Sequence, residues 1–404
     1  MNVLFLHPNF PAQYVHLAGF FAQSRKNKVV FITKEDNGNR INGVQVIKYE
    51  SARACTEGIH QYVKPMEEAV LDGQAVCRVI HNLKQQGFVP DVIVAHTGWG
   101  SSLYVKDLYP KIPLIGYFEW FYTSSGADVG YWEDEVVDIN DKLRIRSMNA
   151  HHLVNLDACD ARYCPTQWQK SQFPKEYRDS MKVFHEGIDT KFCCPKKGTK
   201  LVLPRLNLDL SDKTEIVTYV SRGFEEYRGF PQFMEAVRIL LRTRPKCHVV
   251  IVGNDKSFYG PPPAPNKTYK EIELEKGGFD LSRVHFTGHL NRVEYLNVLQ
   301  SSTVHVYLTR PFVLSWSMLE AMSAGVCLVA SATPPVQEVV EDGHNGLLAN
   351  FRLPEHIAFR INEALMDVDL REKLSKNARE TILERYDLPK MLVEQVNFIY
   401  SQIK

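Results

Sequence analysis

The sequence has almost no net charge and contains no long apolar run. Its 48 lysine and arginine residues balance 47 aspartate and glutamate residues, which leaves a net charge of +1. A chain with this balance has no overall field that would draw it to nucleic acid or to anionic lipid. We therefore expect no nucleic-acid partner. A peripheral contact with the inner face of a membrane would need a local basic and apolar face.

The sequence also lacks a paired-cysteine motif. Its eight cysteines are scattered, and none of them forms a Cys-x-x-Cys pair. This pattern indicates neither a disulfide framework nor a zinc site, and it favours a reducing, cytoplasmic setting. The first residues, MNVLFLHPNF, have no basic stretch before a short apolar run, so they predict a strand rather than a signal peptide. No apolar run approaches the roughly 18 residues that span a bilayer.

The length and the apolar pattern indicate two domains. A chain of 404 residues is too long for one hydrophobic core. Short apolar runs alternate with amphipathic stretches, and this alternation restarts after an irregular segment, GIDTKFCCPKKGTKLVLP. The pattern predicts the α/β class, with two Rossmann-like, doubly wound parallel sheets. The assigned ranges are 1–190 for the first domain, 187–204 for a linker, 205–388 for the second domain, and 389–404 for a C-terminal helix that packs back on the first domain.

Ten strands are expected from the apolar runs, five in each domain. They are 3–7, 28–33, 44–49, 91–96 and 113–118, followed by 214–221, 247–253, 283–288, 304–309 and 326–331. Ligands of doubly wound domains bind beyond the carboxyl ends of such strands. Polar residues and glycines at these ends are therefore the candidates for function.

Two arginines follow the first expected strand of the second domain. Arg222 and Arg228 stand six residues apart in the stretch SRGFEEYRGF. Two guanidinium groups in such a loop can clamp a diphosphate, and they can also lie on a solvated surface. Gly253 ends the next strand, where a glycine lets a ligand approach the backbone.

A single carboxylate stands in the otherwise apolar stretch PFVLSWSMLEAMSAG. A helix is expected to begin near Ser315 or Ser317, with serine as its cap, and to end at Gly325. Glu320 falls within it, and an unpaired buried carboxylate is costly. Local physics leaves two interpretations open. The carboxylate can complement the helix dipole, or it can accept hydrogen bonds from the two hydroxyl groups of a ribose.

The order of these features resembles a known family. Arg-x5-Arg-Gly, a strand ending in glycine, FTGHL and LEAMSAG together resemble the donor domain of the GT-B glycosyltransferases, in particular the retaining enzymes of family 4. The stretches HPNFPAQYVHLA, AHTGWGSSLYVKD and GYFEWFY are similar to the first domain of one subgroup. The resemblance implies transfer of a hexose from a UDP- or GDP-linked sugar to a saccharide, lipid-linked or small-molecule acceptor, as in polysaccharide biosynthesis. No metal and no cofactor besides this co-substrate are implied, since arginines neutralise the diphosphate.

The resemblance also implies a role for individual residues of the second domain. These are Arg222, Gly223 and Arg228 for the diphosphate, Glu320 for the ribose, His289, Leu290 and Gly253 for the base, and Phe312, Val313, Leu314 and Ser315 for the donor sugar. Two positions of this second domain depart from the family pattern. Arg228 stands where lysine is usual, and Phe312 stands where a second glutamate normally contacts the sugar.

In the first domain the resemblance places Glu119 or His96 near the anomeric carbon, in the catalytic role of orienting the acceptor or steadying a cationic transition state. Retaining transfer in this family is thought to need no strong base, because the leaving phosphate can take the acceptor proton. His7 and Asp128 are assigned to the acceptor side. As lone residues, His96 is also explained as a hydrogen bonder at a strand end, and Glu119 as the partner of an arginine.

Two other functions fit the same pattern. A nucleotide-sugar epimerase or hydrolase would share the architecture and consume the donor without an acceptor. A non-catalytic protein that binds nucleotide sugars or glycans would fit the loss of the glutamate at Phe312. The two arginines and Glu320 favour an enzyme that uses nucleotide sugars, because a glycan-binding module needs no diphosphate clamp.

Overall fold

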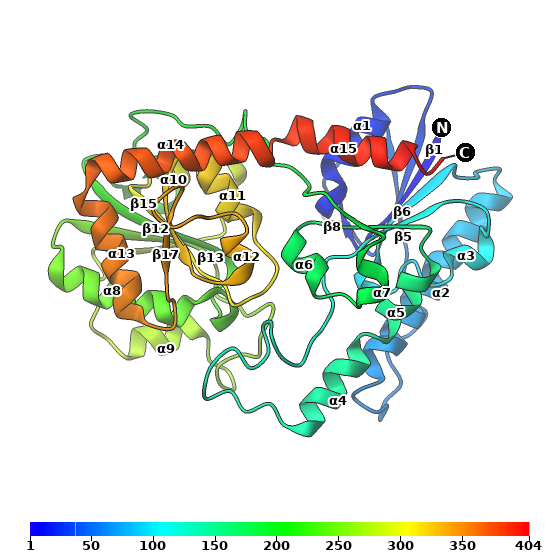
Figure 1. Cartoon of the computed structure of the whole chain (residues 1–404), viewed down its shortest axis with the longest axis horizontal. Helices are drawn as coiled ribbons and strands as arrows, with labels where there is room; N and C mark the ends of the chain where they lie inside the picture. The colour runs from blue at the N-terminus through cyan, green and yellow to red at the C-terminus, as the bar shows by residue number, and fades with distance from the viewer. Residues whose placement is uncertain (37, 404) are drawn as a thin grey trace. The chain divides into compact units, whose positions relative to one another are not determined.

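The computed structural model describes residues 1–36 and 38–403, and the chain divides into two compact units. Unit 1 comprises Met1–Gly187 and Pro389–Lys404, and unit 2 comprises Ile188–Leu388. Each unit is built on one parallel sheet with helices packed against it (Figure 1). The predicted α/β class with two doubly wound domains is confirmed.

The sheet of unit 1 has seven strands in the order β5-β3-β1-β6-β7-β8-β9. Their bounds are β1 (Asn2–Leu6), β3 (Lys28–Thr33), β5 (Val44–Lys48), β6 (Val92–His96), β7 (Leu114–Tyr117), β8 (Ala161–Cys164) and β9 (Met181–Val183). The first five match the expected strands. The last two are only four and three residues long, which is too short to produce a recognisable apolar run.

Both faces of this sheet are buried, which explains its continuous apolar strands. Along β1, Leu4 enters one core cluster, whereas Val3 and Phe5 enter the cluster on the opposite face. Helix α2 (Lys64–Gln85) covers the first face, and helix α1 (Val15–Ala22) covers the second. The other helices of this unit outside its C-terminal segment are α3 (Val105–Leu108), α4 (Ile139–Met148), α5 (Ala150–Ala158), α6 (Gln167–Ser171) and α7 (Lys175–Arg178).

The C-terminal helix α15 (Leu388–Tyr400) packs on the α1 side of this sheet. Val396 and Ile399 are buried in the same core cluster as Phe21 of α1. The side-chain amide of Gln395 donates to the carbonyl of His185 at 2.8 Å. The end of the chain is therefore part of the core of unit 1.

The packing of α15 on unit 1 predicts unequal effects of two alanine substitutions in this helix. Ile399 is 1% exposed, whereas Val393 on the same helix is 56% exposed. We expect Ile399→Ala to lower the stability of unit 1 by about 2–5 kcal/mol, and Val393→Ala to change it by less than about 0.5 kcal/mol. The measurement is hydrogen exchange of β1 and β3 amides in urea. Equal protection in the two variants would show that α15 does not stabilise the sheet.

The sheet of unit 2 has six strands in the order β14-β13-β12-β15-β16-β17. Their bounds are β12 (Glu215–Gly223), β13 (Cys247–Asn254), β14 (Val284–Gly288), β15 (Val304–Tyr307), β16 (Cys327–Ser331) and β17 (Leu347–Ala349). All five expected strands are present, and the short edge strand β17 was missed. The helices are α8 (Phe230–Thr243), α9 (Tyr269–Glu275), α10 (Arg292–Ser301), α11 (Trp316–Ser323), α12 (Pro334–Gln337), α13 (Pro354–Met366) and α14 (Val368–Arg385).

The linker prediction for 187–204 is wrong, because the structure places residues from Ile188 onward inside unit 2. Cys193 and Leu201 are fully buried there. The carbonyl of Cys193 accepts hydrogen bonds from Ser323 at 2.6 Å and from Arg379 at 2.9 Å. An irregular segment can fill a core without any periodicity, so its sequence resembles that of a linker.

None of the helices in the described part of the chain is long and apolar enough to cross a bilayer. The described residues also contain no cluster of histidine, cysteine and carboxylate side chains suited to a metal ion. The sequence contains an Asp-x-Asp triplet, a pattern that can hold a metal-bound diphosphate, at 367–369. There Asp367 caps α14 by accepting a hydrogen bond from the amide of Leu370 at 2.8 Å, which gives the triplet a structural role.

Candidate functional site

In unit 2, Arg228 lies at the end of the loop that follows β12. Gly229 comes next in the left-handed region, at φ 64°, and a Cβ there would lie 2.7 Å from Leu308. This turn directs Arg228 inward, where it is 6% exposed. Its Nη1 donates to the hydroxyls of Tyr307 and Thr309, at 3.0 and 2.9 Å, and to the carbonyl of Val313 at 2.9 Å. Because these acceptors are neutral, they position the guanidinium without neutralising its charge.

Aromatic rings flank both arginines that the sequence assigned to a diphosphate. The Arg228 guanidinium lies 5.2 Å from the ring centre of Tyr259 and 5.7 Å from that of Phe312. Arg222 is exposed, and its guanidinium lies 4.2 Å from the ring centre of Phe258. These are cation–π distances. The segment 258–259 therefore organises both positive charges.

Glu225, which sequence reasoning did not select, fixes that segment. Its side chain is 1% exposed, and Oε2 accepts hydrogen bonds from the amides of Phe258, Tyr259 and Gly260, at 3.0, 2.8 and 3.3 Å. Three N–H groups converging on one carboxylate oxygen make a strong, charge-assisted clamp. The sequence showed only that Glu225 is an acidic residue between two arginines. The amides that it binds lie 33–35 positions further along the chain and could not be predicted from this pattern.

Removing this clamp should loosen the segment that carries the aromatic rings. We expect Glu225→Ala to lower the free energy of unfolding by about 1–3 kcal/mol, because three backbone amides lose their charged acceptor. Amide exchange at 258–260 should accelerate at the same time. The adjacent Glu226→Ala is the control, since that side chain is 37% exposed and forms an ion pair with Arg310 at 3.1 Å. Equal exchange rates in both variants would contradict the clamp.

Two glycines assigned to ligand binding have a role in the packing of the chain itself. A Cβ at Gly223 would lie 2.2 Å from the carbonyl oxygen of Lys256. A Cβ at Gly253, where φ is 147°, would lie 2.1 Å from the carbonyl oxygen of Ser221. Both collisions are with backbone, so a side chain would displace the strands. Gly253 of β13 approaches strand β12, and Gly223 of β12 approaches the segment that follows β13. Contact of either glycine with a ligand stays a prediction.

The helix expected in the apolar stretch is α11. Ser315 caps it, and its hydroxyl accepts a hydrogen bond from the amide of Ser317 at 3.3 Å. Gly325 follows the last turn in the left-handed region, at φ 71°. Both predicted ends are confirmed. Glu320 is the fifth helical residue, and the first turn contains no acidic side chain. The helix dipole acts mainly within the first turn, which disfavours the interpretation of Glu320 as a dipole partner.

Glu320 has a partner that the sequence did not reveal. The hydroxyl of Tyr295, on α10, donates to Glu320 Oε2 at 2.7 Å. Burial raises the pKa of Glu320, while the Tyr295 hydrogen bond and the charge of Arg292 oppose this shift. An ionised carboxylate has about four acceptor positions on its two oxygens. One hydrogen bond from Tyr295 therefore leaves capacity for the hydroxyls of a ligand.

The segment assigned to the donor sugar is joined to Arg228. The backbone amide of Ser315 donates to the Tyr307 hydroxyl at 2.8 Å, and the same hydroxyl accepts from Arg228. Phe312 is partly buried among aromatic rings, and the Leu314 side chain lies in the hydrophobic core. The Arg228–Val313 hydrogen bond connects the predicted diphosphate and sugar positions directly.

The two residues assigned to the base follow β14. His289 is exposed, whereas the Leu290 side chain is 6% exposed and belongs to a core cluster. Any contact of Leu290 with a ligand would therefore come from its backbone. Among the hydrogen bonds described for unit 2, none joins His289 or Leu290 to Arg228.

In unit 1, three of the four selected residues come together at one edge of the sheet. His7 follows β1, His96 ends β6, and Glu119 follows β7. These strands are neighbours, and parallel strands end at a common edge. The ring centres of His7 and His96 are 4.9 Å apart, and His96 Nε2 lies 3.6 Å from Glu119 Oε2. We name His7, His96 and Glu119 the unit 1 cluster.

Backbone hydrogen bonds set the tautomers in this cluster. The amides of Asn9 and Gly98 donate to Nδ1 of His7 and His96, at 2.9 and 3.1 Å. Because an amide can only donate, each neutral ring carries its proton on Nε2. Burial lowers the pKa of His7 well below its ordinary value, and the neighbouring His96 lowers it further. His7 is therefore neutral at pH 7. The interpretation of His96 as a strand-end hydrogen bonder is confirmed by its contact with Gly98.

The fourth residue, Asp128, is buried in the loop that follows β7. Burial raises the pKa of Tyr122, and the charges of Asp128 and Glu119 raise it further. Asp128 therefore influences the same region as the unit 1 cluster. Its role on the acceptor side stays a prediction.

Two family models match the chain. The model described as the glycosyl transferase family 4 group matches residues 25–193, and the model described as glycosyl transferases group 1 matches residues 205–381. The chain is 30% identical over 194 residues to the alpha-D-kanosaminyltransferase of Streptomyces kanamyceticus, which covers 48% of this chain and 47% of the relative. It is 26% identical over 212 residues to the sulfoquinovosyl transferase of Arabidopsis thaliana, which covers 52% of this chain and 38% of the relative. The chain thus matches less than half the length of these two curated relatives.

Among solved structures, the chain is similar to HepE of Anabaena in complex with UDP. The TM-score is 0.71 at 17% sequence identity, covering 99% of this chain and all of the other. An identity this low supports the fold alone, which is the GT-B fold of two parallel-sheet domains.

Proposed function

The chain belongs to the GT-B glycosyltransferases, and from this premise we propose that it is a retaining transferase that moves a hexose from a nucleotide diphosphate sugar without needing a metal ion. Unit 2 would bind this donor, and unit 1 would bind the acceptor. Within the family the donor base stays open between uracil and guanine. UDP is the first choice, because the solved relative HepE was captured with UDP.

The observation that carries this proposal is the setting of Arg228. Its buried guanidinium is held by three neutral acceptors. The nearby carboxylate of Glu225 also acts on it electrostatically, but that carboxylate is itself bound by three backbone amides, so that the guanidinium can still bind an anion. The exposed Arg222 stands six residues before Arg228, near the carboxyl end of β12. Arginine forms strong, charge-assisted hydrogen bonds with phosphate oxygens. A diphosphate leaving group develops charge as its bond to the sugar breaks, and fixed positive groups lower the energy of that state.

If Arg228 binds the diphosphate, roles follow for the residues that would contact the ribose and the acceptor. Glu320 would accept hydrogen bonds from the ribose, since one of its oxygens is held by Tyr295 and the other can face a ligand. The leaving phosphate would take the proton of the acceptor hydroxyl on the same face of the sugar. His96 and Glu119 would orient that hydroxyl, which makes the unit 1 cluster the candidate acceptor site of unit 1.

An assay of donor consumption separates this proposal from its rivals. The purified chain is incubated with UDP-glucose or GDP-mannose and EDTA, with and without a pool of saccharide acceptors, and released nucleotide and new glycosides are measured. We expect release that depends on the acceptor, survives EDTA and gives a product with the anomeric configuration of the donor. Release without any acceptor would favour a hydrolase, and a new nucleotide sugar would favour an epimerase. Binding without release would favour a binding protein.

A further inference from the structure

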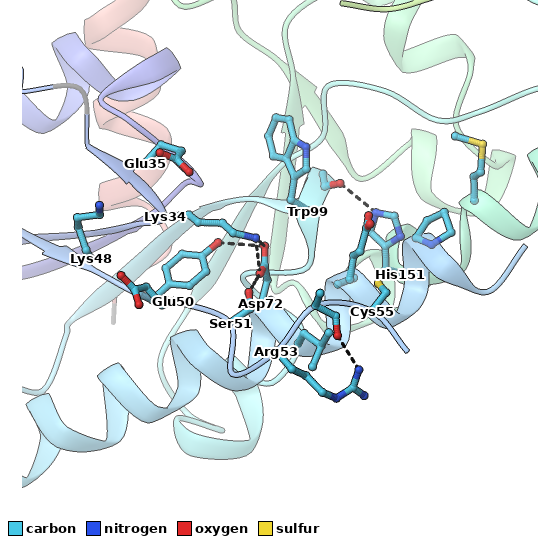
Figure 2. A pocket seen from close by; sticks show the side chains of 18 of the residues that line it. Lys34, Glu35, Lys48, Glu50, Ser51, Arg53, Cys55, Asp72, Trp99 and His151 are labelled. Atoms are coloured by element: carbon cyan, nitrogen blue, oxygen red, sulfur yellow. Dashed lines mark hydrogen bonds and ion pairs between the residues drawn. The ribbon is translucent and has the colours of Figure 1, made fainter. Parts of the chain in front are cut away.

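Unit 1 contains a cavity that none of the assigned roles uses. Its volume is about 770 Å³, and its wall comes from residues that follow β3, β5 and β6 together with residues of α2 (Figure 2). This volume lies within the range of small-ligand sites. The cavity therefore opens at the same sheet edge as the unit 1 cluster.

A buried carboxylate network forms one part of the wall. Asp72, on α2, is 6% exposed and accepts hydrogen bonds from Lys34 Nζ at 2.9 Å, from the Tyr49 hydroxyl at 3.3 Å, and from the Ser51 hydroxyl (Figure 2). Lys34 neutralises Asp72, and the two hydroxyls fix its orientation. This network shapes the cavity and contributes no net charge to it.

The remaining charged groups make the wall acidic. The exposed carboxylates of Glu35, Glu50 and Glu68 line the cavity. Of the cations in the lining, Lys48 is exposed, and Arg53 pairs at 2.7 Å with an α2 carboxylate outside the lining. Three carboxylates therefore stand against one ammonium group, that of Lys48, which also acts electrostatically on the carboxylate of Asp36. An anionic ligand would meet net repulsion here, whereas carboxylate oxygens are good acceptors for hydroxyl groups.

An aromatic side chain connects the cavity to the unit 1 cluster. Trp99 lines the cavity and is 42% exposed. Its indole lies 4.4 Å from the ring centre of His96 and 5.3 Å from that of His7. A ligand stacked on the free part of this indole would extend from the cavity toward the cluster. An aromatic surface beside several hydroxyl acceptors matches the two kinds of surface on a sugar ring, its C–H face and its hydroxyl edge.

We propose that this cavity is the acceptor subsite and that it takes a saccharide without phosphate or carboxylate groups. The sugar ring stacks on Trp99, and its hydroxyls donate to Glu35, Glu50 and Glu68. This inference rests on the proposed transferase function, and it narrows the acceptor class. An acceptor whose anionic group enters this cavity is excluded by its acidic wall.

Ligand-observed NMR on the full chain tests the subsite. The probes are the methyl glycosides of glucose, galactose, mannose and N-acetylglucosamine, with glucuronic acid and glucose 6-phosphate as anionic counterparts. We expect at least one neutral glycoside to bind, and Trp99→Ala to weaken that binding at least tenfold. Trp316→Ala is the matched control, because Trp316 is 39% exposed but lies in unit 2. Binding of the anionic sugars alone, binding indifferent to Trp99→Ala, or no binding at all would overturn the inference.

A change of charge provides a second, independent test. Glu50→Lys combined with Glu68→Lys should reduce binding of the neutral glycoside and let glucose 6-phosphate bind at least tenfold more tightly. Glu176→Lys combined with Glu394→Lys makes the same change in net charge at exposed sites of unit 1 outside the cavity. The control pair should leave both affinities unchanged. Equal effects of the two pairs would show that the cavity wall does not select the ligand.

UDP binding is measured on the same variants to separate this inference from the proposed function. Trp99→Ala should leave the affinity for UDP unchanged, since Trp99 belongs to unit 1. If UDP binds and the donor is consumed, but no neutral glycoside depends on Trp99, the subsite is wrong and the transferase stands. If neither UDP nor UDP-glucose binds, the transferase itself is wrong.

Discussion

Replacing Arg228 with alanine is expected to weaken the binding of a nucleoside diphosphate about 10- to 150-fold. A hydrogen bond to a charged partner contributes about 1.5–3 kcal/mol, which corresponds to this range of dissociation constants. Arg228 should reach the upper part of the range, because it is 6% exposed and water cannot replace it well. Its loss also frees the Tyr307 and Thr309 hydroxyls. The measurement is titration calorimetry with UDP and GDP.

Arg238 provides the matched control. It lies on α8 of the same unit, is 7% exposed, and its Nη1 pairs with Glu273 at 3.0 Å. Its Nε donates to the carbonyl of Gly277 at 2.8 Å. Arg238→Ala should therefore lower stability without changing nucleotide affinity. An unchanged affinity in Arg228→Ala, or an equal loss in both variants, would remove Arg228 from the donor site.

Glu320→Gln is expected to preserve the fold and to lower nucleotide affinity about tenfold or more. The ribose hydroxyls would lose a charged acceptor, and a neutral amide oxygen is the weaker replacement. Stability should not fall at pH 7. Burial raises the pKa of Glu320 above its ordinary 4.5, so the folded chain holds this proton more tightly than the unfolded chain does. Ionisation therefore costs stability as the pH rises from about 4.5 through the raised pKa, and glutamine removes that cost.

Thermal unfolding between pH 4 and pH 8 checks the stability part of this prediction, and UDP titration checks the binding part. The difference in stability between wild type and Glu320→Gln should shift in favour of glutamine as the pH rises. Tyr295→Phe is the companion variant, since it removes one hydrogen bond to the carboxylate and keeps the charge. It should reduce affinity less than Glu320→Gln. Unfolding of Glu320→Gln at pH 7 would instead make Glu320 a structural residue.

The regular parts of the fold were predictable because their signals are local. A strand buried on both faces is largely apolar, and short continuous apolar runs such as those of β1 and β13 favour a buried strand at this length. β9 and β17 have only three residues each, so no periodicity can mark them. The prediction of a linker after Ile188 was wrong because burial in this segment has no local sequence signal. Its buried residues Cys193 and Leu201 are recognisable only from the surfaces that cover them.

In the candidate site, too, some residues could be predicted from the sequence and others could not. Arg228 and Glu320 were selected from motif order, which is visible in the sequence. Tyr307, which holds Arg228, is 79 residues away from it, and Tyr295 is 25 residues away from Glu320. Glu225 acts on amides that carry no side-chain signal at all. Contacts that depend on tertiary neighbours in this way could not be predicted from the sequence.

The central claim is that unit 2 binds a nucleoside diphosphate through its arginines. The most direct test is calorimetric titration of the full chain with UDP, GDP and ADP, each with and without EDTA. We predict binding of UDP or GDP with a dissociation constant that EDTA does not change. At 100 times that constant, the ligand should add about 2.7 kcal/mol to the free energy of unfolding. No binding of any diphosphate, or binding that EDTA abolishes, would contradict the claim.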